Sequence, residues 1–204
     1  MPNQIDTVDG SESKQVNRRT AQREATRARL FEETLKEFTD RGFSGTEISV
    51  VTERVGVSRG AFYVHFTGKD EVLAELLLIE EHRIAARALE VANEGVPLAT
   101  VFGAVVDAVL AAEQRLGRRL VRDLCAAQFR PDFARYQAVD NHPIGLMLID
   151  AIADRSPEVD AIDLAMTFLT GLFGLLATDN APTADRKRRL DLLIQLISKE
   201  PKTP

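Results

Sequence analysis

TEISVVTERVGVSRGAFYVHFTGK, residues 46–69, is the stretch that decides the fold of this 204-residue chain. Thr46 is a suitable N-cap, and apolar residues recur behind it at helical spacing. Gly56 ends this first helix, because glycine tolerates the left-handed backbone of a sharp helix exit. Ser58 then caps a second helix, predicted over residues 59–66. The stretch therefore predicts a helix-turn-helix.

The outer face of the second helix carries side chains that suit DNA. Gly60 and Ala61 have almost no side chain, so the backbone can approach base edges closely. Arg59 has the guanidinium group that pairs with guanine in the major groove. Groups suited to phosphate oxygens accompany it, on Ser58, Tyr63, His65 and Lys69. These features predict a recognition helix that docks in double-stranded DNA.

The motif GVSRGAFYVHFTGKDEVL, with the helix before it, resembles the DNA-binding domain of the TetR family of transcriptional regulators. The resemblance covers about residues 22–76, and the remainder agrees only in length and helical character. It implies an all-helical homodimer that binds a palindromic operator and releases it when a small molecule occupies the C-terminal domain. It also implies phosphate contacts by Thr46, Ser58, Tyr63, His65 and Lys69, and base contacts by Arg59, Gly60 and Ala61.

Two positions depart from the family's pattern. Thr52 stands where the family usually has alanine at a close helix crossing, so the packing has to accommodate a hydroxyl group. Val64 stands where a polar or aromatic residue is common. We include Val64 among the DNA-binding residues, where it contacts either a thymine methyl group or no base at all.

The net charge of −5 is unusual for a DNA-binding protein until it is divided along the chain. Residues 18–70 carry +2, whereas residues 71–204 carry −5, so the positive part coincides with the helix-turn-helix. Residues 1–17 are polar and without periodicity, which predicts a disordered tail. The predicted organisation is this tail, a DNA-binding domain over residues 18–68, and a helical ligand-binding and dimerisation domain over residues 69–204.

Arginines crowd the start of the first predicted helix, which covers residues 21–41. Two interpretations stay open for them: a solvated helix face, or a basic arm that touches phosphates or the minor groove. The residues are Arg18, Arg19, Arg23, Arg27 and Arg29. A long helix over residues 70 to about 93 follows the helix-turn-helix, with Leu73, Leu76, Leu77, Ile84 and Leu89 predicted inward.

Two C-terminal helices, predicted over residues 164–177 and 185–198, are apolar on more than one face. Ser156 and Pro157 provide a start signal before the first of them. Because one stripe of each helix is left without a partner in its own domain, we expect a four-helix bundle across a two-fold axis, with a large monomeric core as the alternative. The predicted dimer interface comprises Leu164, Phe168, Gly171, Gly174, Leu175, Leu190, Leu193, Ile194 and Ile197.

Aromatic and sulfur side chains in the C-terminal domain predict a pocket for a small apolar molecule, although such stripes are more often plain core. The predicted lining is Phe102, Val106, Cys125, Phe129, Phe133, Tyr136, His142, Met147 and Met166. Neither metal-ligand spacing nor a phosphate loop nor a nucleophile elbow is found, so no metal, cofactor or enzymatic activity is expected. The single Cys125 excludes an internal disulfide and fits a reducing cytoplasm.

No segment has 18 uninterrupted apolar residues, which predicts a soluble cytoplasmic protein without a membrane partner. The predicted fold is all-α, with a three-helix helix-turn-helix domain before a helical ligand-binding and dimerisation domain. The predicted function is a ligand-responsive transcriptional repressor. Two alternatives stay open: a ligand-independent or activating regulator, and a helical ligand-binding or enzymatic module without a DNA role.

Overall fold

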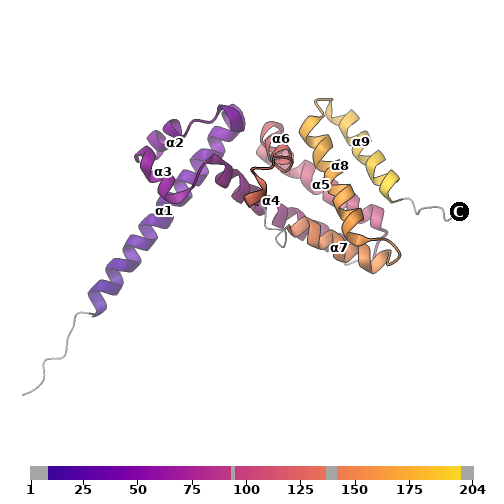
Figure 1. The fold of residues 1–204 in the computed structure, drawn as a ribbon, viewed down its shortest axis with the longest axis horizontal. Coiled ribbons are helices and arrows are strands. Elements are labelled where there is room, and N and C mark those ends of the chain that lie inside the picture. Colours follow the sequence, from indigo (N-terminus) through magenta and orange to yellow (C-terminus); the bar gives the residue numbers. More distant parts are fainter. Residues whose placement is uncertain (1–8, 93–94, 137–141, 199–204) are drawn as a thin grey trace, which may run out of the picture. The chain divides into compact units, whose positions relative to one another are not determined.

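A computed structural model describes residues 9–92, 95–136 and 142–198. Within these ranges every regular element is a helix (Figure 1), which confirms the predicted all-α fold. The chain divides into two compact units, residues 1–69 and residues 70–204. The division lies at the first residue of α4 (Lys69–Ala92), so all of this helix except Lys69 belongs to the second unit.

The first unit contains three helices, α1 (Asp9–Gly45), α2 (Ile48–Val55) and α3 (Arg59–His65). Helix α1 begins at Asp9 rather than at residue 21, so the prediction of a disordered tail is wrong for residues 9–17. No proline interrupts the chain between Asp9 and the predicted helix start, and this stretch includes good helix formers at Glu12, Lys14, Gln15, Arg18 and Arg19. Residues 1–8 lie outside the described residues.

Apolar side chains from all three helices form the core of this unit. Leu30 and Phe38 of α1 and Phe62 of α3 are fully buried. The ring of Phe66, which follows α3, lies 5.5 Å from that of Phe62. Burying such aromatic rings contributes a large share of the stability of a small helical unit. The core therefore fixes α3 by one face and leaves its other face outside.

The second unit contains the remaining helices. They are α4, α5 (Leu98–Leu116), α6 (Arg118–Ala127), the short 3-10 helix η1 (Ala134–Tyr136), α7 (Pro143–Arg155), α8 (Ala161–Thr178) and α9 (Thr183–Ile197). Helix α8 packs against α6, α7 and α9, and α9 also reaches α5 (Figure 1). The rings of Phe102 on α5 and Phe168 on α8 stack with centroids 4.3 Å apart, so a continuous apolar core joins the first and last parts of the unit.

Helix α8 is apolar enough and long enough to cross a membrane, judged by length and composition alone. Its mean hydropathy is 1.7 over 18 residues, and 28% of them are buried within the unit. Asp160 caps its N-terminus by accepting hydrogen bonds from the N–H groups of Ile162 and Asp163. The predicted start signal at Ser156 is wrong, because Ser156 instead ends α7. Because 28% of these 18 residues are buried, apolar residues of α8 remain on the outside of the unit.

Candidate nucleic-acid interface and a groove in the C-terminal unit

The local geometry of the helix-turn-helix follows from two residues. Gly56 ends α2 with φ of 77°, in the left-handed region that its sequence position predicted. Ser58 caps α3, and its hydroxyl oxygen accepts a hydrogen bond from the Ala61 N–H at 3.2 Å. Both predictions are confirmed. A sharp turn and a capped start together set the direction in which α3 leaves the turn.

The outer face of α3 is open. Arg59 is exposed, and a Cβ atom added at Gly60 would meet nothing closer than the Ser58 hydroxyl at 3.8 Å. Tyr63 is exposed as well, and Val64 has 64% of its surface free. An exposed valine beside a glycine and an arginine is a surface that a base pair edge can approach in the major groove. Helix α3 ends at His65, one residue earlier than predicted, with Phe66 as its cap.

His65 is half-buried at the end of α3. Partial burial lowers the pKa of its imidazole, and the positive charges of Arg23 and Arg27 lower that pKa further. The ring is therefore neutral at neutral pH, and it would approach a phosphate as a neutral hydrogen-bond donor rather than as a cation. The same electrostatic coupling shows that α1 arginines lie close to the end of the recognition helix.

Two predicted phosphate ligands are engaged inside the unit. Thr46 is buried, and its hydroxyl donates to the Gly42 carbonyl at 2.8 Å. Glu47, not Thr46, occupies the N-cap of α2, so the predicted capping role of Thr46 is wrong. The Lys69 ammonium donates to the Phe43 carbonyl at 2.7 Å and lies 4.6 Å from the centre of the Phe43 ring. Phosphate contacts by Thr46 and Lys69 stay predictions, and both side chains also hold the end of α1.

The crossing of the helices accommodates the hydroxyl group of Thr52. The side chain is buried, and its oxygen lies 3.0 Å from the carbonyl oxygens of both Ile48 and Ser49 on the same helix. The hydroxyl hydrogen is thus shared within α2 and needs no partner from α1. Glu37 on α1, also buried, pairs instead with Arg54 of α2 at 2.8 Å.

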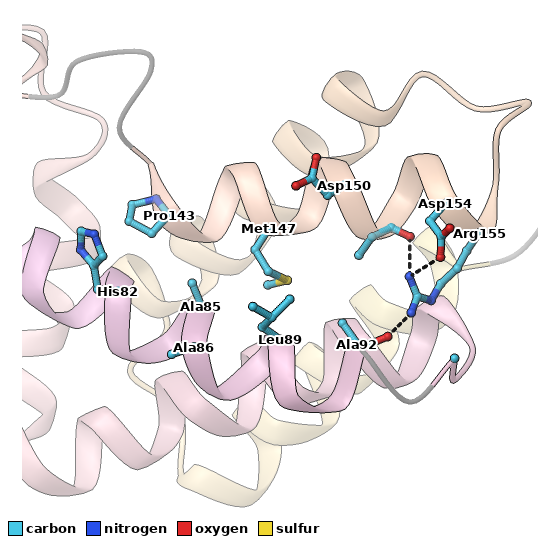
Figure 2. Close-up of a pocket in the computed structure, with 12 residues that line it drawn as sticks. His82, Ala85, Ala86, Leu89, Ala92, Pro143, Met147, Asp150, Asp154 and Arg155 are labelled. Atoms are coloured by element: carbon cyan, nitrogen blue, oxygen red, sulfur yellow. Dashed lines mark hydrogen bonds and ion pairs between the residues drawn. The ribbon is translucent and has the colours of Figure 1, made fainter.

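Helices α4 and α7 border a groove of about 690 Å³ in the second unit (Figure 2). Its lining comprises His82, Ala85, Ala86, Leu89, Ala92, Gly95, Pro143, Met147, Asp150, Ala151, Asp154 and Arg155. Leu89 and Met147 point toward each other across it, and Leu89, which was predicted inward, is 47% exposed. A volume of this size suits a small organic molecule.

Arg155 closes one end of this groove. Its guanidinium group donates to the carbonyl oxygens of Val96 and Ala151, both at 3.0 Å, and to that of Ala92. These bonds join the end of α7 to the end of α4 and hold the guanidinium at the wall (Figure 2). The part of the groove between Ala85, Leu89 and Met147 is therefore apolar, with carboxylates of α7 at its border.

The nine residues of the ligand pocket predicted from the sequence do not line one common cavity in the described structure, and their role stays a prediction. Of the nine, Met147 lines the groove. Three of the others, Phe102, Val106 and Cys125, belong to the packed core. The segment after α6 contains Phe133, which is buried, Tyr136, which is half-buried, and Phe129, which is exposed. Met166 lies on the outside of α8 and is 57% exposed, and His142 lies at the start of α7. Aromatic and sulfur side chains fill the space between helices here, whereas small alanines leave the groove open.

His142 connects α7 to α4 through a buried carboxylate. Its Nδ1 lies 3.3 Å from Glu81 Oε2, and the Gln128 side chain donates to the other Glu81 oxygen at 3.4 Å. Glu81 is 4% exposed. The hydrogen bond to Glu81 raises the pKa of His142, against a smaller opposing effect of burial. The sequence contained no signal for this contact, because its partners are 61 positions apart.

The residues of the predicted dimer interface differ in how deeply the unit buries them, and their role in a dimer stays a prediction. Phe168, Leu190 and Ile194 are buried inside the unit, and a Cβ atom added at Gly171 would lie 2.9 Å from Leu193 of the same chain. Leu164, Gly174, Leu175 and Ile197 are half-buried. The stripe that α8 and α9 leave outside consists of Ile162, Met166, Leu192 and Leu196, each more than half exposed. We call these four residues the outer apolar stripe.

These observations define an all-α protein with an N-terminal helix-turn-helix unit. Residues 30–76 match the family model described as bacterial regulatory proteins, tetR family. The match covers the helix-turn-helix and the start of α4, so this N-terminal part of the chain is similar to the DNA-binding domain of that family. It is 39% identical over 85 residues to the HTH-type transcriptional regulator TtgR of Pseudomonas putida, a stretch that spans 41% of this chain and 40% of that relative.

Solved structures extend the likeness of fold to the second unit. FadR of Thermus thermophilus, a TetR-family repressor in complex with lauroyl-CoA, matches with a TM-score of 0.70 and 19% identity, over 87% of this chain and 98% of its own. AibR in complex with isovaleryl coenzyme A and operator DNA matches with a TM-score of 0.55 and 14% identity, over 84% and 97% of the two chains. At these identities the matches establish the fold.

Proposed function

We propose that this protein is a ligand-responsive transcriptional repressor that binds a palindromic operator as a homodimer in the cytoplasm. One observation carries the proposal: α3 is anchored by Phe62 and presents Arg59, Gly60 and Val64 outward with nothing over them. An arginine beside a glycine on an open helix face fits direct readout of a G·C pair, and an exposed valine fits a thymine methyl group. Ser58, Tyr63 and His65 then meet phosphates, which position the helix.

The outer apolar stripe supports the homodimer. Leu192 and Leu196 are four residues apart on α9 and share one face, and Ile162 and Met166 do so on α8. An apolar surface on two helices is typical of a subunit interface, and a two-fold contact places the same patch of both copies together. Two α8–α9 pairs then form the four-helix bundle. Leu192 and Leu196 face the partner subunit in this bundle, whereas the interface predicted from the sequence contains Leu190, Leu193, Ile194 and Ile197 there.

The groove between α4 and α7 is the proposed effector site. Its apolar centre and its size fit a small organic molecule, and the alanines of α4 leave room for one. The effector can weaken operator binding only as far as it binds the DNA-free state of the protein more tightly than the DNA-bound state. This difference in binding free energy is typically about 1–3 kcal/mol. Linkage requires the operator to weaken effector binding by the same factor.

Selection of bound duplexes from random DNA tests the proposal. The wild-type protein should recover an inverted repeat whose half-sites are one helical turn apart or a multiple of it. The Arg59→Ala variant should recover the same repeat with one base pair per half-site relaxed. Recovery of no preferred sequence by the wild-type protein would refute the regulator and favour a helical ligand-binding module.

Lauroyl-CoA and isovaleryl coenzyme A, the ligands of the two structural neighbours, are the first effector probes. Calorimetry with and without operator should give a weaker ligand affinity in the presence of DNA. The Leu89→Arg variant, which places a long charged side chain in the groove, should lose the heat of ligand binding and keep its operator affinity. Equal ligand affinity in both titrations would contradict the release mechanism for that ligand.

A further inference from the structure

The N-terminal half of α1 carries a concentration of positive charge. Residues 15–31 contain five arginines and one glutamate. The structure separates these arginines by what they contact. Arg29 donates to the Val55 carbonyl at 2.9 Å and so caps the end of α2, which is a structural role. Arg18, Arg19 and Arg23 are exposed, and none of them forms a hydrogen bond or an ion pair with the side chains described.

Three of the arginines form a row that ends beside the recognition helix. Arg19, Arg23 and Arg27 are four residues apart in succession, so they share one face of α1. The Arg27 guanidinium lies 4.5 Å from the centre of the Phe66 ring, directly after α3. Arg23 and Arg27 are both close enough to His65 to repel its protonated form. The row therefore adjoins the end of α3, where His65 is one of the predicted phosphate-contacting residues.

Like charges at this spacing destabilise an isolated helix. Glu24 is the single acidic residue within residues 15–31, and within the described residues it forms no ion pair with Arg19 or Arg23. A helix that keeps Arg19 and Arg23 exposed one turn apart on one face is suited to a partner with a matching line of negative charge. The phosphate backbone of DNA has one charge about every 3.4 Å of axis on each strand.

We propose that Arg18, Arg19 and Arg23 bind phosphates of the operator that flank each half-site, so that α1 extends the interface formed by α3. This inference rests on the proposed DNA-binding function. The rise of a helix places Arg19 about 12 Å along the axis from Arg27, which corresponds to three or four base pairs of B-DNA. The contacts add affinity without reading bases, because guanidinium–phosphate pairs carry no sequence information.

The triple variant Arg18→Gln, Arg19→Gln, Arg23→Gln tests the inference, with Lys36→Gln as the control. Lys36 is a cation on the same helix, 63% exposed and half a helical turn away from the face of Arg27. Binding is measured between 50 and 200 mM salt on a long operator. If all three phosphate contacts exist, the slope of log affinity against log salt should fall by about 2.7 in magnitude. The wild-type affinity should then drop about 40-fold more over this range than that of the triple variant.

A second duplex locates the contacts. When the operator is trimmed by about four base pairs on each side, the wild-type protein and the triple variant should bind alike, because the flanking phosphates are gone. The sequences recovered by selection should be the same for both proteins. Circular dichroism should show equal helix content, since the three side chains are exposed.

Each contrary result has a definite meaning. If the triple variant keeps the wild-type salt slope while the wild-type protein binds its operator, the α1 contacts are refuted and the proposed function stands. If the difference persists on the trimmed duplex, or if Lys36→Gln causes an equal change, overall charge rather than contacts by Arg18, Arg19 and Arg23 is responsible, and the inference is overturned. Failure of the wild-type protein to prefer any duplex refutes the proposed function instead.

Discussion

The two units of this protein build their candidate sites in different ways. In the helix-turn-helix unit the contacts that set the start and the buried face of α3 join residues close in sequence: the Ser58 cap spans three positions, and the Phe62 and Phe66 rings are one helical turn apart. In the C-terminal unit the side-chain contacts between helices join residues that are far apart in the sequence. The hydrogen bond from Arg186 to Glu113 spans 73 positions, and that between His142 and Glu81 spans 61.

This difference has a physical consequence for substitutions. A residue on α3 is positioned by its own helix and by the core under it, so changing its exposed side chain alters recognition and little else. A residue on α8 or α9 is positioned by several helices, and whether it stabilises the fold or the assembly depends on which stripe it occupies. Substitutions in both units test this contrast.

The largest effect is expected from the outer apolar stripe. The double variant Leu192→Glu, Leu196→Glu should dissociate the dimer, because two unpaired carboxylates would be buried in the subunit contact, at several kcal/mol. Operator affinity should fall at least about 100-fold, since the two half-sites would no longer be held together. Sedimentation and mobility shift measure the two effects.

Two further variants separate assembly from folding. Lys187→Gln, at an exposed position on the side of the same helix opposite Leu196, should leave the dimer intact. Leu190→Glu, by contrast, places a charge in the fully buried core and should lower the thermal midpoint of the unit itself. A wild-type protein that sediments as a stable monomer at micromolar concentration would contradict the proposed interface.

A smaller effect is expected on α3. Arg59→Ala should cost about 1–3 kcal/mol in operator binding and relax preference at one base pair in each half-site. Lys69→Ala should instead lower the free energy of unfolding by about 1.5–3 kcal/mol, because the Phe43 carbonyl loses a hydrogen bond from a charged donor. Chemical denaturation and binding to substituted operators distinguish the two variants. An unchanged stability of Lys69→Ala, with a weaker dependence on salt, would restore Lys69 as chiefly a phosphate ligand.

The contrast between the units also explains how much the sequence could predict. The turn at Gly56 and the cap at Ser58 were predicted correctly because the backbone preference of glycine and the capping chemistry of serine act within a few residues. In all these cases the deciding interaction lies inside the stretch that was interpreted.

Predictions that needed a distant partner were less successful. Leu190 and Leu192 are both leucines on an amphipathic helix, and only the position of α5 and α8 decides that Leu190 is buried and Leu192 exposed. From the sequence, Phe102 suited either a pocket or a core. The structure decides for the core, because the centroid of its ring lies 4.3 Å from that of Phe168. The groove was missed because alanines on α4 give no signal: what matters is the volume that they leave unfilled.

A modest effect on stability is expected at the His142–Glu81 contact. The pKa of His142 is raised in the folded state, so its contribution is fully present below the unfolded pKa, near 6.5, and is lost as the pH rises through the folded value. His142→Gln should therefore lower the free energy of unfolding more at pH 5.5 than at pH 8.5. Urea denaturation at the two values measures the difference. In the Glu81→Gln background the effect of His142→Gln should no longer depend on pH in this window, and a persisting dependence would assign it to another group.

The smallest effect is expected at Cys125, where reactivity rather than stability distinguishes the two interpretations of the region. Burial raises the pKa of this thiol to about 12, with a further contribution from the charge of Glu113. The thiolate, which is the reactive form, is then scarce at pH 8. Iodoacetamide should modify the native protein slower than the urea-unfolded protein by a factor on the order of 10³, as judged from the thiolate fractions. Leu89→Arg should not change this rate, because Cys125 is packed beneath α5 and α8 and does not line the groove. Rapid modification of the native thiol would show that the space around Phe102 and Cys125 opens to solvent, and it would move the effector site from the groove back to the interior of the unit.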